Sequence, residues 1–347
     1  MINKLLRKNI RDLKPYHSAR IEYPGKNAIF LDANENSIGS VLEEGYNRYP
    51  DPLQTELHRV ISKLKNTNAN NMFLGNGSDE AIDLLIRAFC EPRDEEIILC
   101  PPTYGVYSVS AKINDVEIAE VPLTPQFDLD ITRILDRINS KTKLIFLCSP
   151  NNPSGNILNA DMILKLLDKF PGIVIIDEAY IDFSSTESWI KSLNRYRNLV
   201  VLQTFSKAWG LANLRLGMAF AHPDIITVLN NIKYPYNLSG VTQELVLDAL
   251  KNKKNKEKMV DEIIRQRSFL QAKLEKLSLI KKVYPSEANF LLVKVENAAF
   301  IYEKLMNKKI IVRNRSNLQR CDNCIRITVG TAEENKNLLD AMKSLDG

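Results

Sequence analysis

Three polar side chains stand at or just beyond the ends of apolar, strand-like runs. Asn152 follows "KLIFLC", Asp177 lies in "GIVIIDEAY", and Lys207 follows "LVVLQTFS". In open α/β sheets, ligands bind outside the carboxyl ends of the strands, so these groups are expected to converge on one cleft. Each alone has a plainer explanation as a turn, a helix cap or a solvated surface charge. Together, an amide, a carboxylate and an amine predict a catalytic cleft.

The stretch "GNGSDE" predicts an anion-binding turn. Its glycines allow a ligand to approach the backbone, and Ser78 or Asp79 opens a helix whose free N–H groups favour negative charge. It is not a Walker loop, because no Gly-Lys-Ser/Thr follows, and a simple capped turn explains it about as well. A phosphate is favoured because hydroxyl and guanidinium partners are available from Thr204, Ser206 and Arg215.

A lysine, a buried acid and a phosphate cradle are the groups that pyridoxal phosphate needs. Its aldehyde forms a Schiff base with a lysine, its ring nitrogen needs a carboxylate partner, and its phosphate needs an anchor. We expect Lys207 to bond the aldehyde and Asp177 to hold the ring nitrogen. Tyr180 and Asn152 are candidates for the ring hydroxyl, and Tyr104 of "PPTYG" is a candidate to stack on the ring.

The elements that must position these residues alternate between helical and β-branched segments, which is typical of a layered α/β protein. We expect a large domain over 41–240 and a small α+β domain over 241–347, with residues 1–40 packing against the small domain. In the large domain the pattern predicts a helix over 79–89 and strands over 96–100, 143–148, 172–180, 199–207 and 216–221. In the small domain it predicts helices over 241–276, 298–308 and 332–345 and strands over 289–295, 308–314 and 324–331.

Composition excludes several other classes of function. Lys and Arg number 47 against 42 Asp and Glu in 347 residues, and this weak, mixed charge does not favour nucleic acid. No apolar run has the length of a membrane span. Five scattered cysteines suit free thiols in a reducing compartment, so the cytoplasm is expected. The lone "CDNC" at 321–324 predicts two free thiols in a loop rather than a metal site.

The ordered motifs "LDANEN", "RYPDP", "GNGSDEAIDLL", "PTYGVY", "SPNNPSG", "IIDEAY", "TFSKAWGLANLRLG" and "CIRITVGT" resemble those of the histidinol-phosphate aminotransferases. The resemblance runs from about residue 11 to the C-terminus. That family belongs to the fold-type I enzymes that use pyridoxal phosphate. The resemblance implies a mostly parallel seven-stranded sheet flanked by helices, with "LGMAFA" as its antiparallel strand. It also implies transamination between L-histidinol phosphate and 2-oxoglutarate, giving imidazole-acetol phosphate and L-glutamate.

The resemblance implies further roles for the cofactor site. Lys207 would also carry the proton between the substrate Cα and the cofactor C4′, and Tyr180 and Asn152 would contact the ring oxygen. Tyr49 of "RYPDP" would reach the cofactor phosphate of a neighbouring subunit, which implies a homodimer. The remaining phosphate ligands would be Gly77, Ser78, Asp79, Thr204, Ser206 and Arg215.

For the substrates, the resemblance implies that Arg326 binds the α-carboxylate of glutamate or the phosphate of histidinol phosphate. A guanidinium fork suits both anions. Arg313 and Tyr16 match other phosphate-binding positions, and Asn34 of "LDANEN" is a further substrate-binding candidate. Ser37 stands where the family usually has proline, and "GS" follows where "GP" is common, so the shape of this N-terminal loop is left open.

Other reactions remain compatible with the same residues. A threonine-phosphate decarboxylase and a broader aromatic aminotransferase share the fold and much of the motif set, and spacing does not reveal which Cα bond is broken. A non-catalytic binding protein that retained the fold is the alternative from a different class. The intact lysine, acid and arginine argue against it.

Overall fold

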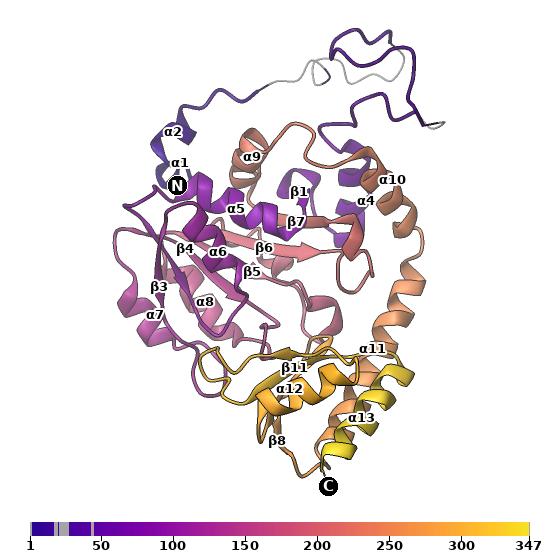
Figure 1. Ribbon diagram of the computed structural model, residues 1–347. Coiled ribbons are helices and arrows are strands. Elements are labelled where there is room, and N and C mark those ends of the chain that lie inside the picture. Colours follow the sequence, from indigo (N-terminus) through magenta and orange to yellow (C-terminus); the bar gives the residue numbers. More distant parts are fainter. Residues whose placement is uncertain (1, 17–19, 21–27, 43–44, 347) are drawn as a thin grey trace.

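The computed structural model describes residues 2–16, 20, 28–42 and 45–346, and they form two sheets with flanking helices (Figure 1). The larger sheet has seven strands, the number that the resemblance implied, and their order is β1-β7-β6-β5-β4-β2-β3. Its strands are β1 (Met72–Asn76), β2 (Glu96–Leu99), β3 (Glu117–Glu120), β4 (Thr142–Cys148), β5 (Ile173–Asp177), β6 (Leu199–Thr204) and β7 (Leu216–Ala221).

The strands of the larger sheet run parallel except for β7, which pairs antiparallel with both β1 and β6. The prediction of "LGMAFA" as the antiparallel strand is therefore confirmed. Strands β5, β6 and β7 are buried along their whole length. Continuous apolar runs of this kind arise because helices cover both faces of a parallel sheet.

Two sets of helices cover the two faces of this sheet, each over its own apolar core. One face carries α5 (Ser78–Phe89), α6 (Val106–Ile113) and α9 (Pro223–Ile232). The other carries α4 (Thr55–Lys65), α7 (Ile131–Arg137), α8 (Ala160–Lys169) and α10 (Gly240–Leu250). The carboxyl ends of β4, β5 and β6 are thereby held rigidly at one edge of the sheet.

The N-terminal residues form the short helices α1 (Ile2–Leu5) and α2 (Lys8–Arg11). Ile2 and Leu6 are buried in the core beneath α5, and the Arg7 N–H donates to the Ala88 carbonyl at 3.1 Å. The expectation that this segment packs with the small domain is wrong for α1 and α2, because their apolar side chains cover the end of α5. Residues 28–42 extend from the large domain at the end opposite the small sheet (Figure 1).

The small sheet has the order β10-β11-β9-β8. Its strands are β8 (Ile280–Val283), β9 (Phe290–Val295), β10 (Arg313–Asn314) and β11 (Cys324–Thr328), and its helices are α11 (Lys253–Leu274), α12 (Ala298–Asn307) and α13 (Ala332–Asp346). The strand predicted over 308–314 pairs only as β10, because Lys309 has φ 60° and breaks the extended run. None of the helices in the described part of the chain has the length and hydropathy needed to cross a bilayer.

The single helix predicted over 241–276 is two helices, α10 and α11, separated at Lys251 and Asn252. Val246 and Leu250 of α10 belong to the core of the large sheet, whereas Leu270 and Leu274 of α11 belong to the core of the small one. The break lets one stretch of chain pack on two separate cores.

Candidate active site

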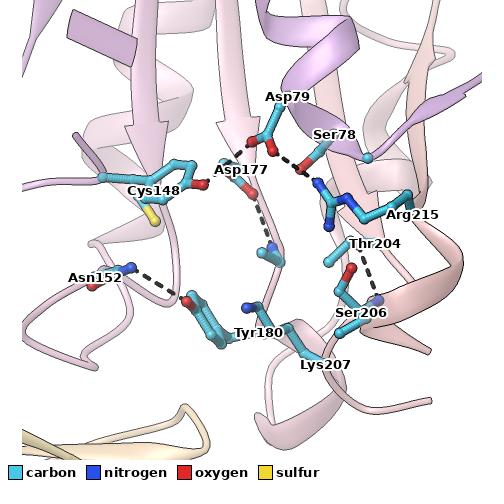
Figure 2. Close-up of a pocket in the computed structure, with 14 residues that line it drawn as sticks. Ser78, Asp79, Cys148, Asn152, Asp177, Tyr180, Thr204, Ser206, Lys207 and Arg215 are labelled. Carbon is cyan, nitrogen blue, oxygen red and sulfur yellow. Dashed lines mark hydrogen bonds and ion pairs between the residues drawn. The ribbon is translucent and has the colours of Figure 1, made fainter. Parts of the chain in front are cut away.

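A cavity of about 570 Å³, part of it open to solvent, lies at the carboxyl ends of β4, β5 and β6 beside the N-terminus of α5 (Figure 2). The polar groups predicted from separate motifs meet there. Its lining includes Gly77, Ser78, Asp79, Tyr104, Asn152, Asp177, Tyr180, Thr204, Ser206, Lys207 and Arg215.

Lys207 lies just beyond β6, with its amine 5.8 Å from the centroid of the Tyr180 ring. Partial burial lowers the pKa of Lys207, as does the positive charge of Arg326, while Asp177 acts in the opposite direction. A lowered pKa raises the fraction of neutral amine, which is the nucleophilic form. The surroundings of Lys207 therefore favour the nucleophilic amine that its position in the sequence predicted.

Asp177 ends β5 and is 2% exposed. Its carboxylate accepts hydrogen bonds from the Tyr107 hydroxyl at 2.7 Å and from the Ala179 N–H at 3.0 Å. Burial raises the pKa of Asp177 to about 6, although both hydrogen bonds favour the charged form. A buried carboxylate beside a cavity is stabilised by a cationic ligand, and a protonated ring nitrogen meets that need.

Asn152 connects the two sheets. Its Nδ2 donates to the Tyr180 hydroxyl at 3.3 Å, and its Oδ1 accepts from Arg326 Nη1 at 2.5 Å. Arg326 comes from β11, and its guanidinium lies 5.2 Å from the centroid of Phe290. The predicted substrate arginine therefore stands next to the predicted ring-binding amide.

The N-terminus of α5 forms a cradle for an anion. Gly77, the N-cap, has φ 74° and supplies no side chain to cap the helix. A Cβ added there would lie 2.6 Å from Arg215 Nη2, so only glycine leaves the cradle open. Arg215 pairs with Asp79 at 3.1 Å, and the Ser78, Thr204 and Ser206 hydroxyls line the same end of the cavity. N–H groups, hydroxyls and a guanidinium fit a phosphate.

Tyr104 lies at the cavity wall between the cradle and Asp177. Its hydroxyl is 3.3 Å from Asp79 Oδ1, and its ring packs edge-on against Tyr107 with centroids 5.5 Å apart. Burial raises the pKa of Tyr104, so the side chain stays neutral at ordinary pH. Its placement is compatible with a ring stacked against it.

Five predicted residues do not line the cavity. Arg326 lies just outside the lining and contacts it through Asn152. Tyr16 and Asn34 are exposed, and Tyr49 is exposed while its ring stacks on Tyr236 with centroids 4.4 Å apart. Arg313 is also exposed and lies directly opposite Arg326 in the β10–β11 ladder.

The prediction from sequence missed Tyr107 and Cys148. Tyr107 is fully buried on α6 and bonds Asp177, and Cys148 lines the cavity at the end of β4. The signal for Tyr107 was available: a tyrosine on the buried face of a short helix needs a partner for its hydroxyl.

The "CDNC" cysteines lie away from the cavity lining, and both Cys321 and Cys324 are buried free thiols. Cys321 lies in a loop, as predicted, whereas Cys324 begins β11. Within the described residues, no group of three or more His, Cys, Asp or Glu side chains is arranged to hold a metal ion.

Comparison with known proteins agrees with this arrangement. The family model described as aminotransferase class I and II matches residues 22–342. The histidinol-phosphate aminotransferase of Cytophaga hutchinsonii is 52% identical over 343 residues, which cover 99% of each chain. The chain belongs to the histidinol-phosphate aminotransferase family. The resemblance noted in the sequence motifs is thereby confirmed.

Solved structures of this family share the fold. The histidinol-phosphate aminotransferase of Clostridium acetobutylicum matches with a TM-score of 0.80 at 24% identity, over 87% of this chain and 91% of that one. The Sinorhizobium meliloti enzyme, solved in complex with pyridoxal-5'-phosphate, matches with a TM-score of 0.78 at 21% identity, over 90% and 89%. At these identities the likeness shows the fold.

Proposed function

We propose that this protein transfers the amino group between L-histidinol phosphate and 2-oxoglutarate with pyridoxal phosphate as cofactor, giving imidazole-acetol phosphate and L-glutamate. The main support for the proposal is that Lys207, Asp177 and the open N-terminus of α5 all line one cavity. Two relatives that are 52% identical over 99% of this chain are named histidinol-phosphate aminotransferase, which supports the choice of substrate.

The residues present fit the cofactor at each of its functional groups. Asp177 would hold the ring nitrogen, Tyr180 and Asn152 the ring oxygen, and Tyr104 the ring face. The phosphate would be held by Arg215 and by the cradle of Gly77, Ser78, Asp79, Thr204 and Ser206, all of which line the cavity. When bound, pyridoxal phosphate supplies an electron sink for the bond broken at the substrate Cα.

Lys207 performs the proton transfer. With the cofactor bound, its Nζ would hold the aldehyde. Once released, the same amine would carry the proton that leaves the substrate Cα. Its lowered pKa increases the fraction of neutral amine, the form that accepts a proton.

Arg326 and Arg313 hold the substrate anions. The two arginines are direct neighbours across the β10–β11 ladder, and Arg326 reaches the Asn152 amide at the cavity edge. A guanidinium fork binds a carboxylate or a phosphate equally well, so one site serves both half-reactions. Tyr16 and Asn34 remain candidates for further substrate contacts, although both are exposed and lie outside the cavity lining.

The functional unit is a homodimer in which Tyr49 of one subunit reaches the cofactor phosphate of the other. Support comes from the segment around Tyr49, which exposes large apolar side chains: Ile29 is 89%, Leu31 82% and Ile38 97% exposed. A monomer rarely leaves so much apolar surface in contact with water. A second copy that covers the segment would bury these side chains and complete both active sites.

We place the enzyme in the cytoplasm. All five of its cysteines are buried free thiols, and none forms a disulfide. Free thiols persist in a reducing compartment.

The decisive experiment supplies histidinol phosphate with 2-oxoglutarate, and separately O-phosphothreonine, to the enzyme loaded with pyridoxal phosphate. We expect glutamate from the first mixture and no carbon dioxide from the second. Carbon dioxide without glutamate would overturn the proposal in favour of a decarboxylase.

Two lysine variants test whether Lys207 is the residue that bonds the cofactor. Lys207→Ala should abolish turnover and the borohydride-fixed cofactor adduct, measured by mass spectrometry of the intact protein. Lys191→Ala, which removes an exposed lysine paired with Glu187, should keep both. An adduct that survives in Lys207→Ala would reject the assignment of Lys207.

A further inference from the structure

Arg315 lies one residue beyond β10 and continues its pairing with β11. Its N–H donates to the Cys324 carbonyl at 2.8 Å, in the same register that places Arg313 opposite Arg326. Alternate residues of a strand point to the same face of a sheet, and directly opposed residues share a face. Arg313, Arg315 and Arg326 are therefore three guanidinium groups on one face of the small sheet.

No carboxylate in the described part of the chain forms an ion pair with these three arginines. In contrast, Arg20 and Arg48 share Glu35, and Arg137 pairs with Glu96. The Arg315 Nε is buried and makes no hydrogen bond to any described group. Clustered, partly desolvated cations without a counter-charge are costly, which points to an anion as the missing partner.

The cluster lies beside the cavity, because Arg326 donates a hydrogen bond to Asn152, which lines it. Burial lowers the pKa of Arg326, and the positive charge of Arg315 lowers it further. Burial and Arg313 lower the pKa of Arg315 in turn, while Tyr180 acts in the opposite direction. Arg315 is thus near enough to both Arg326 and Tyr180 to interact with them electrostatically.

We propose that Arg315 is a specificity-determining residue that, with Arg313, recognises the phosphate dianion of the amino substrate. The inference rests on the proposed function. Arg326 alone matches the single charge of a carboxylate, whereas a phosphate presents about two charges and three acceptor oxygens. Arg315 therefore favours phosphorylated substrates and contributes little to the binding of glutamate or 2-oxoglutarate.

The test compares the two half-reactions in Arg315→Gln, Arg315→Lys and a matched control, Arg320→Gln. Arg320 is an exposed arginine that lies five residues further along the same loop. We expect Arg315→Gln to lower kcat/KM for histidinol phosphate about 10- to 100-fold, the range for a lost charge-assisted hydrogen bond. The same variant should change kcat/KM for glutamate less than about 3-fold, and Arg320→Gln should change neither.

A pH profile separates anion recognition from a structural role. In the wild type, kcat/KM for histidinol phosphate should rise across about pH 6 as the phosphate gains its second charge. This rise should flatten in Arg315→Gln and partly return in Arg315→Lys, which keeps the charge without the planar fork. A structural role would leave the shape of the profile unchanged.

The outcomes also separate this inference from the proposed function. A wild type that is inactive with both substrates contradicts the proposed function itself. A wild type active with both, whose Arg315 variants lose both half-reactions equally or neither, overturns the role of Arg315 alone. If Arg315→Gln fails to fold by circular dichroism, Arg315→Lys carries the same comparison, and an equal loss for both substrates overturns the role.

Discussion

The Tyr107 hydroxyl donates a hydrogen bond of 2.7 Å to Asp177 Oδ2, and both side chains are almost completely buried. This bond stabilises the charged form of the carboxylate against the opposing effect of burial, which raises the pKa of Asp177 to about 6. The charged form is the one needed to hold a protonated ring nitrogen. Tyr107 therefore acts as a positioning residue for Asp177.

Replacing Tyr107 with Phe should raise the pKa of Asp177 and weaken cofactor binding about 10-fold, because one charge-stabilising hydrogen bond is lost. Fluorescence titration of the cofactor-free protein with pyridoxal phosphate measures this. Tyr196→Phe is the matched control, since the Tyr196 hydroxyl is buried without a partner among the described residues. Equal effects of the two substitutions would argue against a specific role for Tyr107.

Gly77→Ala should also weaken cofactor binding, by more than about 10-fold. Gly77 has φ 74°, and a Cβ there would press on Arg215 Nη2 at 2.6 Å, so both strain and a displaced guanidinium result. The control is Gly105→Ala, where φ is −66° and a Cβ meets nothing within 4 Å. Binding constants and thermal unfolding of the two variants give the comparison, and unaltered affinity in Gly77→Ala would contradict the phosphate cradle.

Glu178→Gln should alter how stability depends on pH. Burial raises the pKa of Glu178 to about 7, so the folded state holds a proton that the unfolded state has released above about pH 4.5. Its contribution to stability therefore falls as pH rises from about 4.5 to 7. Relative to wild type, the variant should gain about 3 kcal/mol in unfolding free energy between pH 4.5 and 8, by urea denaturation. A difference that is constant with pH would be inconsistent with this titration.

Glu35→Ala should disturb the segment that carries Tyr49. Glu35 accepts hydrogen bonds from Arg20 at 3.0 Å, from Arg48 at 2.7 Å and from the Tyr49 N–H at 2.6 Å. Without them Tyr49 loses its fixed position, and we expect weaker dimers by sedimentation and faster release of the cofactor. Glu187→Ala, at an exposed site in the large domain, should leave both unchanged. Normal dimers and normal release in Glu35→Ala would speak against the shared site.

The core of the site was predictable because it follows from sheet geometry. Asn152, Asp177 and Lys207 come after apolar runs, and parallel strands bring such positions to one edge. Contacts between distant segments were not predictable in this way. The bond from Tyr107 to Asp177 spans 70 residues, and the packing of Ile2 beneath α5 depends on a helix some 80 residues away. The break between α10 and α11 at Lys251 was also not predictable, because no proline or glycine marks it. The break arises because the two helices pack on separate cores.

The Asn152 amide is divided between two tasks: its oxygen accepts from Arg326 and its nitrogen donates to Tyr180. If Arg326 binds a substrate anion as proposed, that anion would compete with the Asn152 oxygen for the guanidinium. Anion binding would then release the amide beside Tyr180. One side chain would thereby link the binding of the substrate anion to the end of the cavity where the reaction takes place.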